Sequence, residues 1–162
     1  MVMAATKDNN AKRQAQSTAL KRDLAVGALI YRPGYGLYLQ KKTKSRDADN
    51  PSWDVATSEV PNHETVREAL TKQIAEETGW QLKDVKALLH HREWRKPGSR
   101  TSRWVDEYDF LVTVDESEDT PRHANDLKGW QWLTRDSLGD LKAGEKKHVH
   151  EMVAKALDYL GI

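Results

Sequence analysis

The chain has 162 residues, a length typical of one domain of about 100 to 200 residues with at most a tail. Its 26 lysines and arginines against 25 aspartates and glutamates leave a formal net charge of +1, so the broad basic surface of a nucleic-acid-binding protein is not expected. The sequence has no cysteine, which excludes disulfides, thiolate zinc sites and a cysteine nucleophile and fits a reducing compartment.

The N-terminal part of the chain shows neither a signal peptide nor a membrane span. The longest mainly apolar run, Leu24 to Tyr31, is too short to cross a bilayer. We therefore expect a soluble, cytoplasmic protein without a membrane partner. Residues 1–22 are polar and basic without a sustained apolar period, which predicts a mobile arm, and residues 23–162 are predicted to form the folded domain.

The first half of the domain is predicted to contain a hairpin and a helix. Residues 24–31 and 37–41 read as strands around a Pro-Gly turn, and residues 53–55 read as a short strand after a charged loop. A helix is expected over 65–78. Thr65 and Glu68 form a capping-box pattern at its start, and Gly79 supplies a left-handed stop.

The second half is predicted to alternate strands with loops before a closing helix. Strands are expected at 85–94, 103–114 and 127–133, and an amphipathic helix from about Glu145 to Leu160. Strands before and after an internal helix, followed by a terminal helix, imply an α+β fold in which a mixed sheet packs between helices.

The helix over 65–78 carries the residues with the clearest chemistry. At about 100° per residue, its apolar side chains share one face, which is expected to meet the sheet. Gln73, Glu76 and Glu77 fall on the same side, without a Lys or Arg of this helix beside them. Carboxylates that leave water need a compensating partner, and a hard divalent cation is one solution. The alternative is an exposed last turn whose glutamates pair with cations from elsewhere in the chain.

Residues 58–80 resemble the Nudix box, GX5EX7REUXEEXGU, with its spacing intact. Glu64, Ile74, Glu76, Glu77 and Gly79 coincide with the pattern. At four positions the sequence departs from it: Ser58 replaces the first Gly, Lys72 the Arg, Gln73 the first Glu of the core and Trp80 the last aliphatic residue. The resemblance implies a Nudix-like α/β/α sandwich over most of the domain.

The same resemblance implies hydrolysis of a small-molecule substrate, a nucleoside diphosphate linked to another moiety, with Mg²⁺ or Mn²⁺ as cofactor. By the resemblance, Glu76 and Glu77 hold the metal and the main-chain carbonyl of Ser58 adds a ligand. Glu64 steadies the loop or water network around the metal, and Lys72 keeps the positive charge that orients the carboxylates. The metal polarises phosphoryl oxygens and positions the attacking water.

Gln73 is the departure with the largest expected effect, because an amide cannot accept a proton near neutral pH and binds a divalent cation more weakly than a carboxylate. Losing a general base lowers a rate by roughly 10²- to 10⁴-fold unless another group substitutes. The candidates for that role are Glu107, Asp109, His123 and Asp126. Asp126 lies where Nudix proteins carry a late-loop acid, although it also reads as a turn residue. Attenuated catalysis is therefore expected.

Two other functions stay open at this point. A nucleotide- or diphosphate-binding module that has lost turnover is consistent with Lys72 and Gln73. A prenyl diphosphate-processing enzyme rests only on residues 53–60, which are similar to the approach in isopentenyl diphosphate isomerases, a family that relies on a cysteine this chain lacks. The substrate and the formation of a homodimer are not decided by the sequence.

The histidine pairs and the tryptophans are interpreted mainly as structural. His90 and His91 are expected to point to opposite faces of one strand, and His148 and His150 lack a third ligand at helical spacing. The six tryptophans are expected to fill the core, with stacking on a base as the open alternative.

Overall fold

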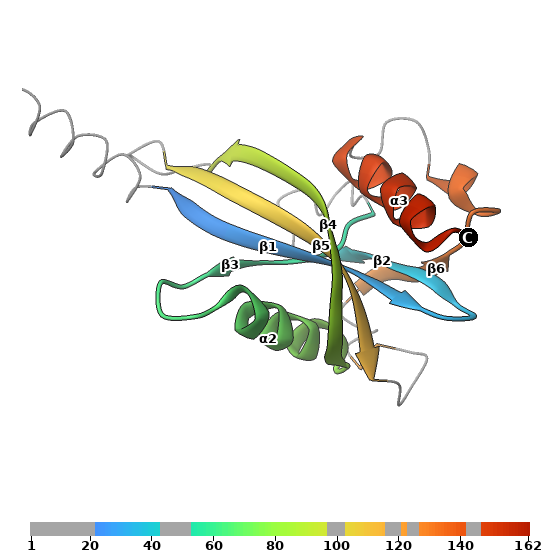
Figure 1. Cartoon of the computed structure of the whole chain (residues 1–162), viewed down its shortest axis with the longest axis horizontal. Helices are drawn as coiled ribbons and strands as arrows, with labels where there is room; N and C mark the ends of the chain where they lie inside the picture. Colours follow the sequence, from blue (N-terminus) through green and yellow to red (C-terminus); the bar gives the residue numbers. More distant parts are fainter. Residues whose placement is uncertain (1–21, 43–52, 97–102, 116–120, 123–126, 142–146) are drawn as a thin grey trace, which may run out of the picture.

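The computed structural model describes residues 22–42, 53–96, 103–115, 121–122, 127–141 and 147–162. Within these residues the chain forms a six-stranded mixed sheet with one long helix on each side (Figure 1). This arrangement confirms the predicted α+β fold. The elements in chain order are β1 (Asp23–Arg32), β2 (Gly36–Lys42), β3 (Ala56–Val60), α2 (Val66–Thr78), β4 (Gln81–Arg95), β5 (Trp104–Asp115), β6 (Leu127–Leu133), a short 3₁₀ helix (Leu138–Asp140) and α3 (Lys147–Leu160).

The sheet is built around β1, in the order β4-β5-β1-β2-β6. β1 runs parallel to β5 over nearly its whole length, and all the other strand pairs are antiparallel. The other edge of β1 is shared, since β3 pairs with residues 24–28 and β2 pairs with residues 30–32. Asp54, two residues before β3, exchanges two backbone hydrogen bonds of 3.0 and 2.9 Å with Gln40 of β2.

The predicted strands are confirmed with shifted bounds, except the one at 53–55. The structure has only an isolated bridge at Asp54, and the strand is β3 at Ala56–Val60. β3 is placed by its register against β1, a partner that the local sequence does not show. β4 begins four residues earlier than expected, directly after α2, and its register against β5 shifts at three points. Those shifts break the alternation of polar and apolar residues from which a strand is predicted.

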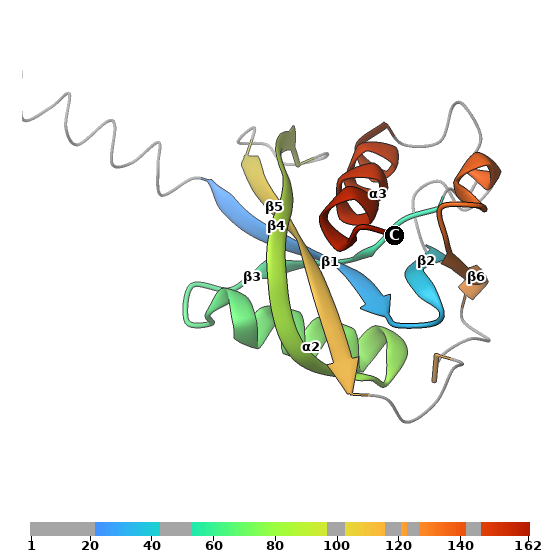
Figure 2. The same ribbon diagram turned by 45° about the vertical axis from the view of Figure 1, so that its right-hand side comes forward.

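Figure 2 shows α2 and α3 on opposite faces of the sheet. Each of the two faces has its own apolar core. We call these the α2 face and the α3 face. The α2 face buries residues from four strands against α2 and Trp80, and the α3 face buries residues from five strands against α3. The buried side chains of α2 are Ala69, Leu70, Ile74 and Thr78, and those of α3 are Val149, Met152, Val153, Ala156 and Leu157.

The predicted N-terminal arm lies outside the described residues except for Arg22. The Arg22 guanidinium binds Asp106 through two hydrogen bonds of 2.9 Å, and its Nη2 atom is 2.6 Å from a Glu93 carboxylate oxygen. In the described parts of the chain, no helix has the length and apolar character needed to cross a membrane.

Candidate active site

The helix α2 begins and ends as its sequence predicts. The Thr65 hydroxyl accepts a 3.1 Å hydrogen bond from the Glu68 amide and lies 3.0 Å from the Glu68 carboxylate, which is the predicted capping box. Gly79 has a φ of 79°, and its amide donates to the Ala75 carbonyl at 2.9 Å. A left-handed residue therefore ends the helix directly after the box glutamates.

The last turn of α2 is fixed from several sides. The Thr78 hydroxyl donates to the Ile74 carbonyl at 2.6 Å and accepts from the Trp80 amide at 3.1 Å. The Arg122 amide donates to the Thr78 carbonyl at 2.7 Å, and the Arg122 side chain packs so closely on Gly79 that a Cβ there would overlap it. These contacts hold the backbone that carries Glu76 and Glu77 against both β4 and the segment after β5.

The three polar box residues on this turn differ in burial. Gln73 and Glu77 are half-buried, one turn apart on the same side of the helix, whereas Glu76 is exposed. The prediction that all three turn toward the sheet is therefore correct for Gln73 and Glu77 and wrong for Glu76. Glu76 lies at the margin of the apolar stripe formed by Ala69, Leu70 and Ile74, on the side that faces water.

Glu64 and Lys72 form an ion pair at the outer side of the box. The Lys72 Nζ atom is 3.9 Å from a Glu64 carboxylate oxygen. Lys72 is mostly exposed, so this pair is screened by water and holds the loop before α2 only weakly. Ser58 lies in β3 opposite Val26, and its hydroxyl donates to the Glu59 carbonyl at 3.1 Å. The predicted Asp126 and the alternative His123 lie outside the described residues.

Glu77 is tied to the sheet by a hydrogen-bonded chain of buried side chains. The Gln40 amide nitrogen donates to a Glu77 carboxylate oxygen at 3.3 Å, and the Tyr38 hydroxyl donates to the Gln40 amide oxygen at 3.0 Å. Burial, and after it the charge of Glu77, raises the pKa of the Tyr38 hydroxyl above its usual range, so Tyr38 keeps its proton. Neither Tyr38 nor Gln40 is among the predicted site residues. Their alternation with Leu37 and Leu39 in β2 is typical of a strand with one solvated face, so it does not reveal that both side chains are buried.

The other two base candidates, Glu107 and Asp109, lie on the α3 face and therefore not beside Glu77. They are spaced by two residues along β5 from each other and from Leu111 of the α3-face core, so all three side chains share one face. Arg92 binds the Glu107 carboxylate through two hydrogen bonds of 2.9 and 3.1 Å. Asp109 is 0% exposed, and its oxygens accept no hydrogen bond in the described part of the structure. Burial, and after it the charge of Glu107, raises the pKa of Asp109 to about 8.

The histidines of β4 point to opposite faces, as predicted. His90 lies on the α3 face, with Nδ1 3.7 Å from Asp109 and Nε2 3.6 Å from Glu151 of α3. His91 stacks on Tyr108 on the α2 face and lies 3.3 Å from Asp106. His91, Glu93 and Asp106 together could in principle ligate a metal, but Arg22 already bridges the two carboxylates.

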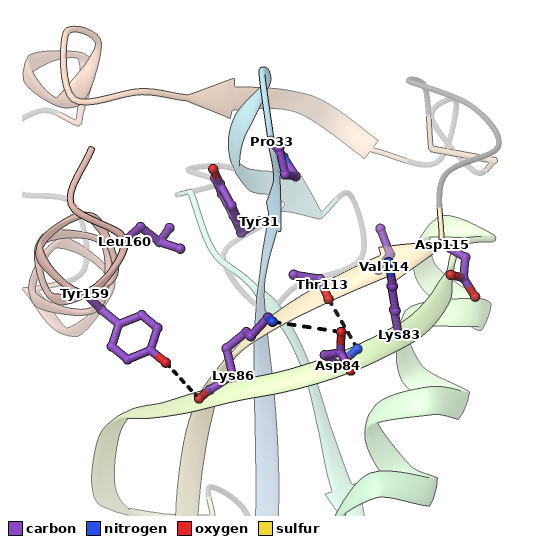
Figure 3. A pocket seen from close by; sticks show the side chains of 10 residues that line it. All are labelled: Tyr31, Pro33, Lys83, Asp84, Lys86, Thr113, Val114, Asp115, Tyr159 and Leu160. Atoms are coloured by element: carbon purple, nitrogen blue, oxygen red, sulfur yellow. Dashed lines mark hydrogen bonds and ion pairs between the residues drawn. The ribbon is translucent and has the colours of Figure 1, made fainter.

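Among the described cavities, one of about 710 Å³ lies beside α3 rather than at the box (Figure 3). Its polar groups bind one another: the Tyr159 hydroxyl donates to the Lys86 carbonyl at 3.3 Å, and Lys86 lies 3.9 Å from Asp84. Tyr31 and Leu160, which also line it, pack against the α3-face core. This cavity is therefore separate from the box glutamates.

The donor set at the end of α2 fits a hard divalent cation. Two consecutive carboxylates and the amide of Gln73 one turn earlier are all oxygen donors, the type that Mg²⁺ and Mn²⁺ prefer. They lie at the C-terminal end of a helix, where the backbone dipole repels negative charge, and the last turn has no basic residue. A bound cation would offset the repulsion between the helix dipole and the carboxylates, and it would supply the positive charge that the last turn lacks.

The family model described as NUDIX domain matches residues 21–155. The chain belongs to this family. Solved Nudix structures share the fold of the chain. A MutT NUDIX hydrolase from Burkholderia pseudomallei is 19% identical, with 83% of this chain and 97% of that chain covered and a TM-score of 0.63. A NUDIX hydrolase from Nitrosomonas europaea is 14% identical, with 86% and 89% covered and a TM-score of 0.61.

A third structure, of a possible asymmetric diadenosine tetraphosphate hydrolase from Jonesia denitrificans, is 16% identical, with 86% and 95% covered and a TM-score of 0.65. None of the curated proteins matches the sequence. At these identities the structural likeness concerns the Nudix fold, and the chemistry has to be argued from the residues of this chain.

Proposed function

We propose that this Nudix domain is a divalent-metal-dependent hydrolase that cleaves a diphosphate linkage in a nucleoside diphosphate derivative or a related small molecule, with attenuated catalysis. The observation that carries the proposal is the last turn of α2. It keeps both box glutamates, Glu76 and Glu77, on a backbone fixed by Thr78 and Gly79, and Glu77 is bound to the sheet through Gln40.

In this proposal Glu76 and Glu77 hold Mg²⁺ or Mn²⁺, and the main-chain carbonyl of Ser58, in β3, adds a ligand. When bound, the cation polarises the phosphoryl oxygens and lowers the pKa of a water molecule. Glu76, which is exposed, is free to turn toward an incoming metal–diphosphate complex, whereas Glu77 is held in place. Lys72 supports the site indirectly through its ion pair with Glu64.

Gln73 accounts for the attenuation in the proposal. It occupies the position one turn before Glu77, from which a carboxylate could contact the metal or accept the proton of the attacking water. Its amide supplies an oxygen ligand but no base, so a loss of roughly 10²- to 10⁴-fold in rate is expected relative to a variant with a carboxylate there. Asp126 is the proposed substitute base.

The test is turnover by the full chain with Mg²⁺ or Mn²⁺ against ADP-ribose, dinucleoside polyphosphates, nucleoside triphosphates and prenyl diphosphates. We expect release of phosphate or a monophosphate product from at least one class, and a large loss with Glu76→Gln, which keeps the shape of the side chain but removes its charge. Product release equal to that of the Glu76→Gln control for every substrate would contradict hydrolase activity.

The second candidate function, a binding module without turnover, is favoured by the paired departures at Lys72 and Gln73. It predicts that a substrate raises the melting temperature of the protein without being consumed. Under this alternative Gln73→Glu should create activity. Under the hydrolase proposal the same change should accelerate a reaction already present, so the activity of the unmodified chain distinguishes the two.

A further inference from the structure

Gln40 is a polar side chain in the middle of the α2 face. It is 0% exposed and belongs to β2, two residues after Tyr38 and on the same side of the strand. Burying an amide without hydrogen bonds costs about 1–3 kcal/mol, so an apolar residue would serve better if this position only filled space. The two hydrogen bonds that Gln40 makes, to Tyr38 and Glu77, are therefore the feature to explain.

The orientation of the Gln40 amide follows from its two neighbours. Tyr38 is protonated, so its hydroxyl has a hydrogen to donate to the amide oxygen at 3.0 Å. The NH₂ group then faces the Glu77 carboxylate at 3.3 Å. The reversed amide would set its oxygen against a carboxylate oxygen, which is repulsive. The chain of donors consequently runs in one direction, from Tyr38 through Gln40 to Glu77.

Both ends of this chain are rigid. The backbone of Gln40 is held by its two hydrogen bonds to Asp54, and Tyr38 packs edge-on against Trp80 with ring centroids 5.0 Å apart. At the other end, Thr78 and Gly79 fix the turn that carries Glu77. A hydrogen bond between two fixed points restricts the plane of the Glu77 carboxyl group. Because the amide is neutral, it orients the carboxylate without cancelling its charge.

We propose that Gln40, itself oriented by Tyr38, is a positioning residue that holds the Glu77 carboxylate in the orientation a divalent cation requires. The inference rests on the proposed function, because it takes Glu77 to be a metal ligand. Hydrogen-bond partners of metal ligands typically contribute 10- to 100-fold in metal affinity or activity. Tyr38 and Gln40 belong to β2, outside the box, so the box pattern alone does not reveal the hydrogen bonds that link them to Glu77.

The experiment is a titration of the full chain with Mn²⁺, in which electron paramagnetic resonance reports the free ion. Gln40→Met keeps the length of the side chain but removes the donor, and it should weaken Mn²⁺ binding roughly 10-fold or more. Tyr38→Phe leaves Gln40 in place but frees its amide to turn, and it should weaken binding about two- to tenfold, the range of one neutral hydrogen bond. Tyr31→Phe, the same change on the α3 face, is the matched control and should bind Mn²⁺ as the unmodified chain does.

A double-mutant cycle separates positioning from general damage to the fold. If Gln40 acts through Glu77, then Gln40→Met should cause no further loss of Mn²⁺ affinity once Glu77→Gln is present. A purely structural role predicts the opposite, namely an equal loss in both backgrounds. Should Gln40→Met fail to fold, the same cycle is run with Tyr38→Phe, which removes a single oxygen.

The outcomes distinguish this inference from the proposed function. If the unmodified chain binds no Mn²⁺, with or without a diphosphate, the proposed function fails and the inference fails with it. If the unmodified chain binds Mn²⁺ and both Gln40→Met and Tyr38→Phe bind it equally well, the inference alone is overturned. Weaker binding in both variants, abolished in the Glu77→Gln background, supports it.

Discussion

The two faces of the sheet differ in the polar side chains that they bury. On the α2 face a neutral chain from Tyr38 to Gln40 leads outward to a half-buried carboxylate, Glu77, at the end of a helix. On the α3 face the carboxylates of Glu107 and Asp109 are themselves buried, and Arg92 compensates one of them. The α2 face therefore places its carboxylate at the margin of the core on neutral partners, whereas the α3 face encloses two carboxyl groups within the protein.

The largest expected effect on the free energy of unfolding comes from removing Arg92 from its ion pair with Glu107 on the α3 face. Arg92→Leu leaves Glu107 buried without its cation, which should lower the free energy of unfolding by about 3 kcal/mol or more. Urea denaturation at pH 7 measures it. The double variant Arg92→Leu/Glu107→Leu should recover much of the loss, because an apolar pair of similar volume can replace a buried ion pair. Equal instability of the single and double variants would show that Arg92 acts by packing.

Asp109 should make stability depend on pH. Its pKa of about 8 lies far above the value near 4 of an unfolded aspartate, so the folded protein retains a proton that the unfolded chain releases. The free energy of unfolding should therefore fall as the pH rises from about 4 to about 8, by at most about 1.4 kcal/mol per pH unit. Asp109→Asn is uncharged at every pH and should flatten this slope.

Asp106 on the α2 face is the matched control for Asp109. The Arg22 guanidinium lowers the pKa of Asp106, so its contribution should be present at neutral pH and lost as the pH falls below about 4. Asp106→Asn should leave the slope between pH 5 and pH 8 intact. The α3-face interpretation is contradicted if Asp109→Asn shows the same slope as the unmodified chain.

Gly27 should not tolerate a side chain, because Asp109 packs directly against its backbone. A Cβ at Gly27 would overlap Oδ1 of Asp109 and lie 3.4 Å from Cγ2 of Val55. Gly27→Ala should destabilise the protein by about 1–3 kcal/mol, measured by urea denaturation. Gly139→Ala, where nothing lies within 4 Å of the new Cβ, should have little effect. A Gly27→Ala protein as stable as Gly139→Ala would mean that Asp109 moves without cost.

The smallest expected effect on stability is on the α2 face. Tyr38→Phe removes one buried neutral hydrogen bond and should lower the free energy of unfolding without metal by about 1 kcal/mol. Thermal unfolding without divalent ions measures it. A loss as large as that of Arg92→Leu would show that the neutral chain holds the fold together, and the contrast between the faces would disappear.

Local sequence patterns predicted what local interactions determine. Thr65, Glu68 and Gly79 specify the ends of α2 within one turn, and the confirmed helix bounds follow from them. The apolar run of β1, the Pro-Gly turn that follows it and the apolar stripe of α3 likewise predicted elements that the structure contains. The Nudix fold was implied by the resemblance of residues 58–80 to the Nudix box, and the family match confirms it.

The pairing of strands that lie far apart in the chain could not be predicted from local sequence patterns. β3 is placed by β1, and the bulges of β4 are set by β5, so their bounds depend on partners distant in the chain. The same holds for the candidate site. Glu77 could be read from the box, but its donor Gln40 lies 37 positions away on another strand. Glu107 and Asp109 read as accessible acids because nothing local reveals that Arg92 and α3 cover them.

The parallel pairing of β1 with β5 has a consequence for how the chain acquires its structure. β1 precedes β5 in the chain and lies in the middle of the sheet, so its edge facing β5 stays unpaired until β5 has been made. The ion pair between Asp23 and Arg103, 80 positions apart, spans a similar distance in sequence. Closing so long a loop comes before any of its contacts can form, and such topologies fold slowly. A chain that lacks β5 would leave this edge of β1 without a partner strand, and unpaired strand edges promote aggregation.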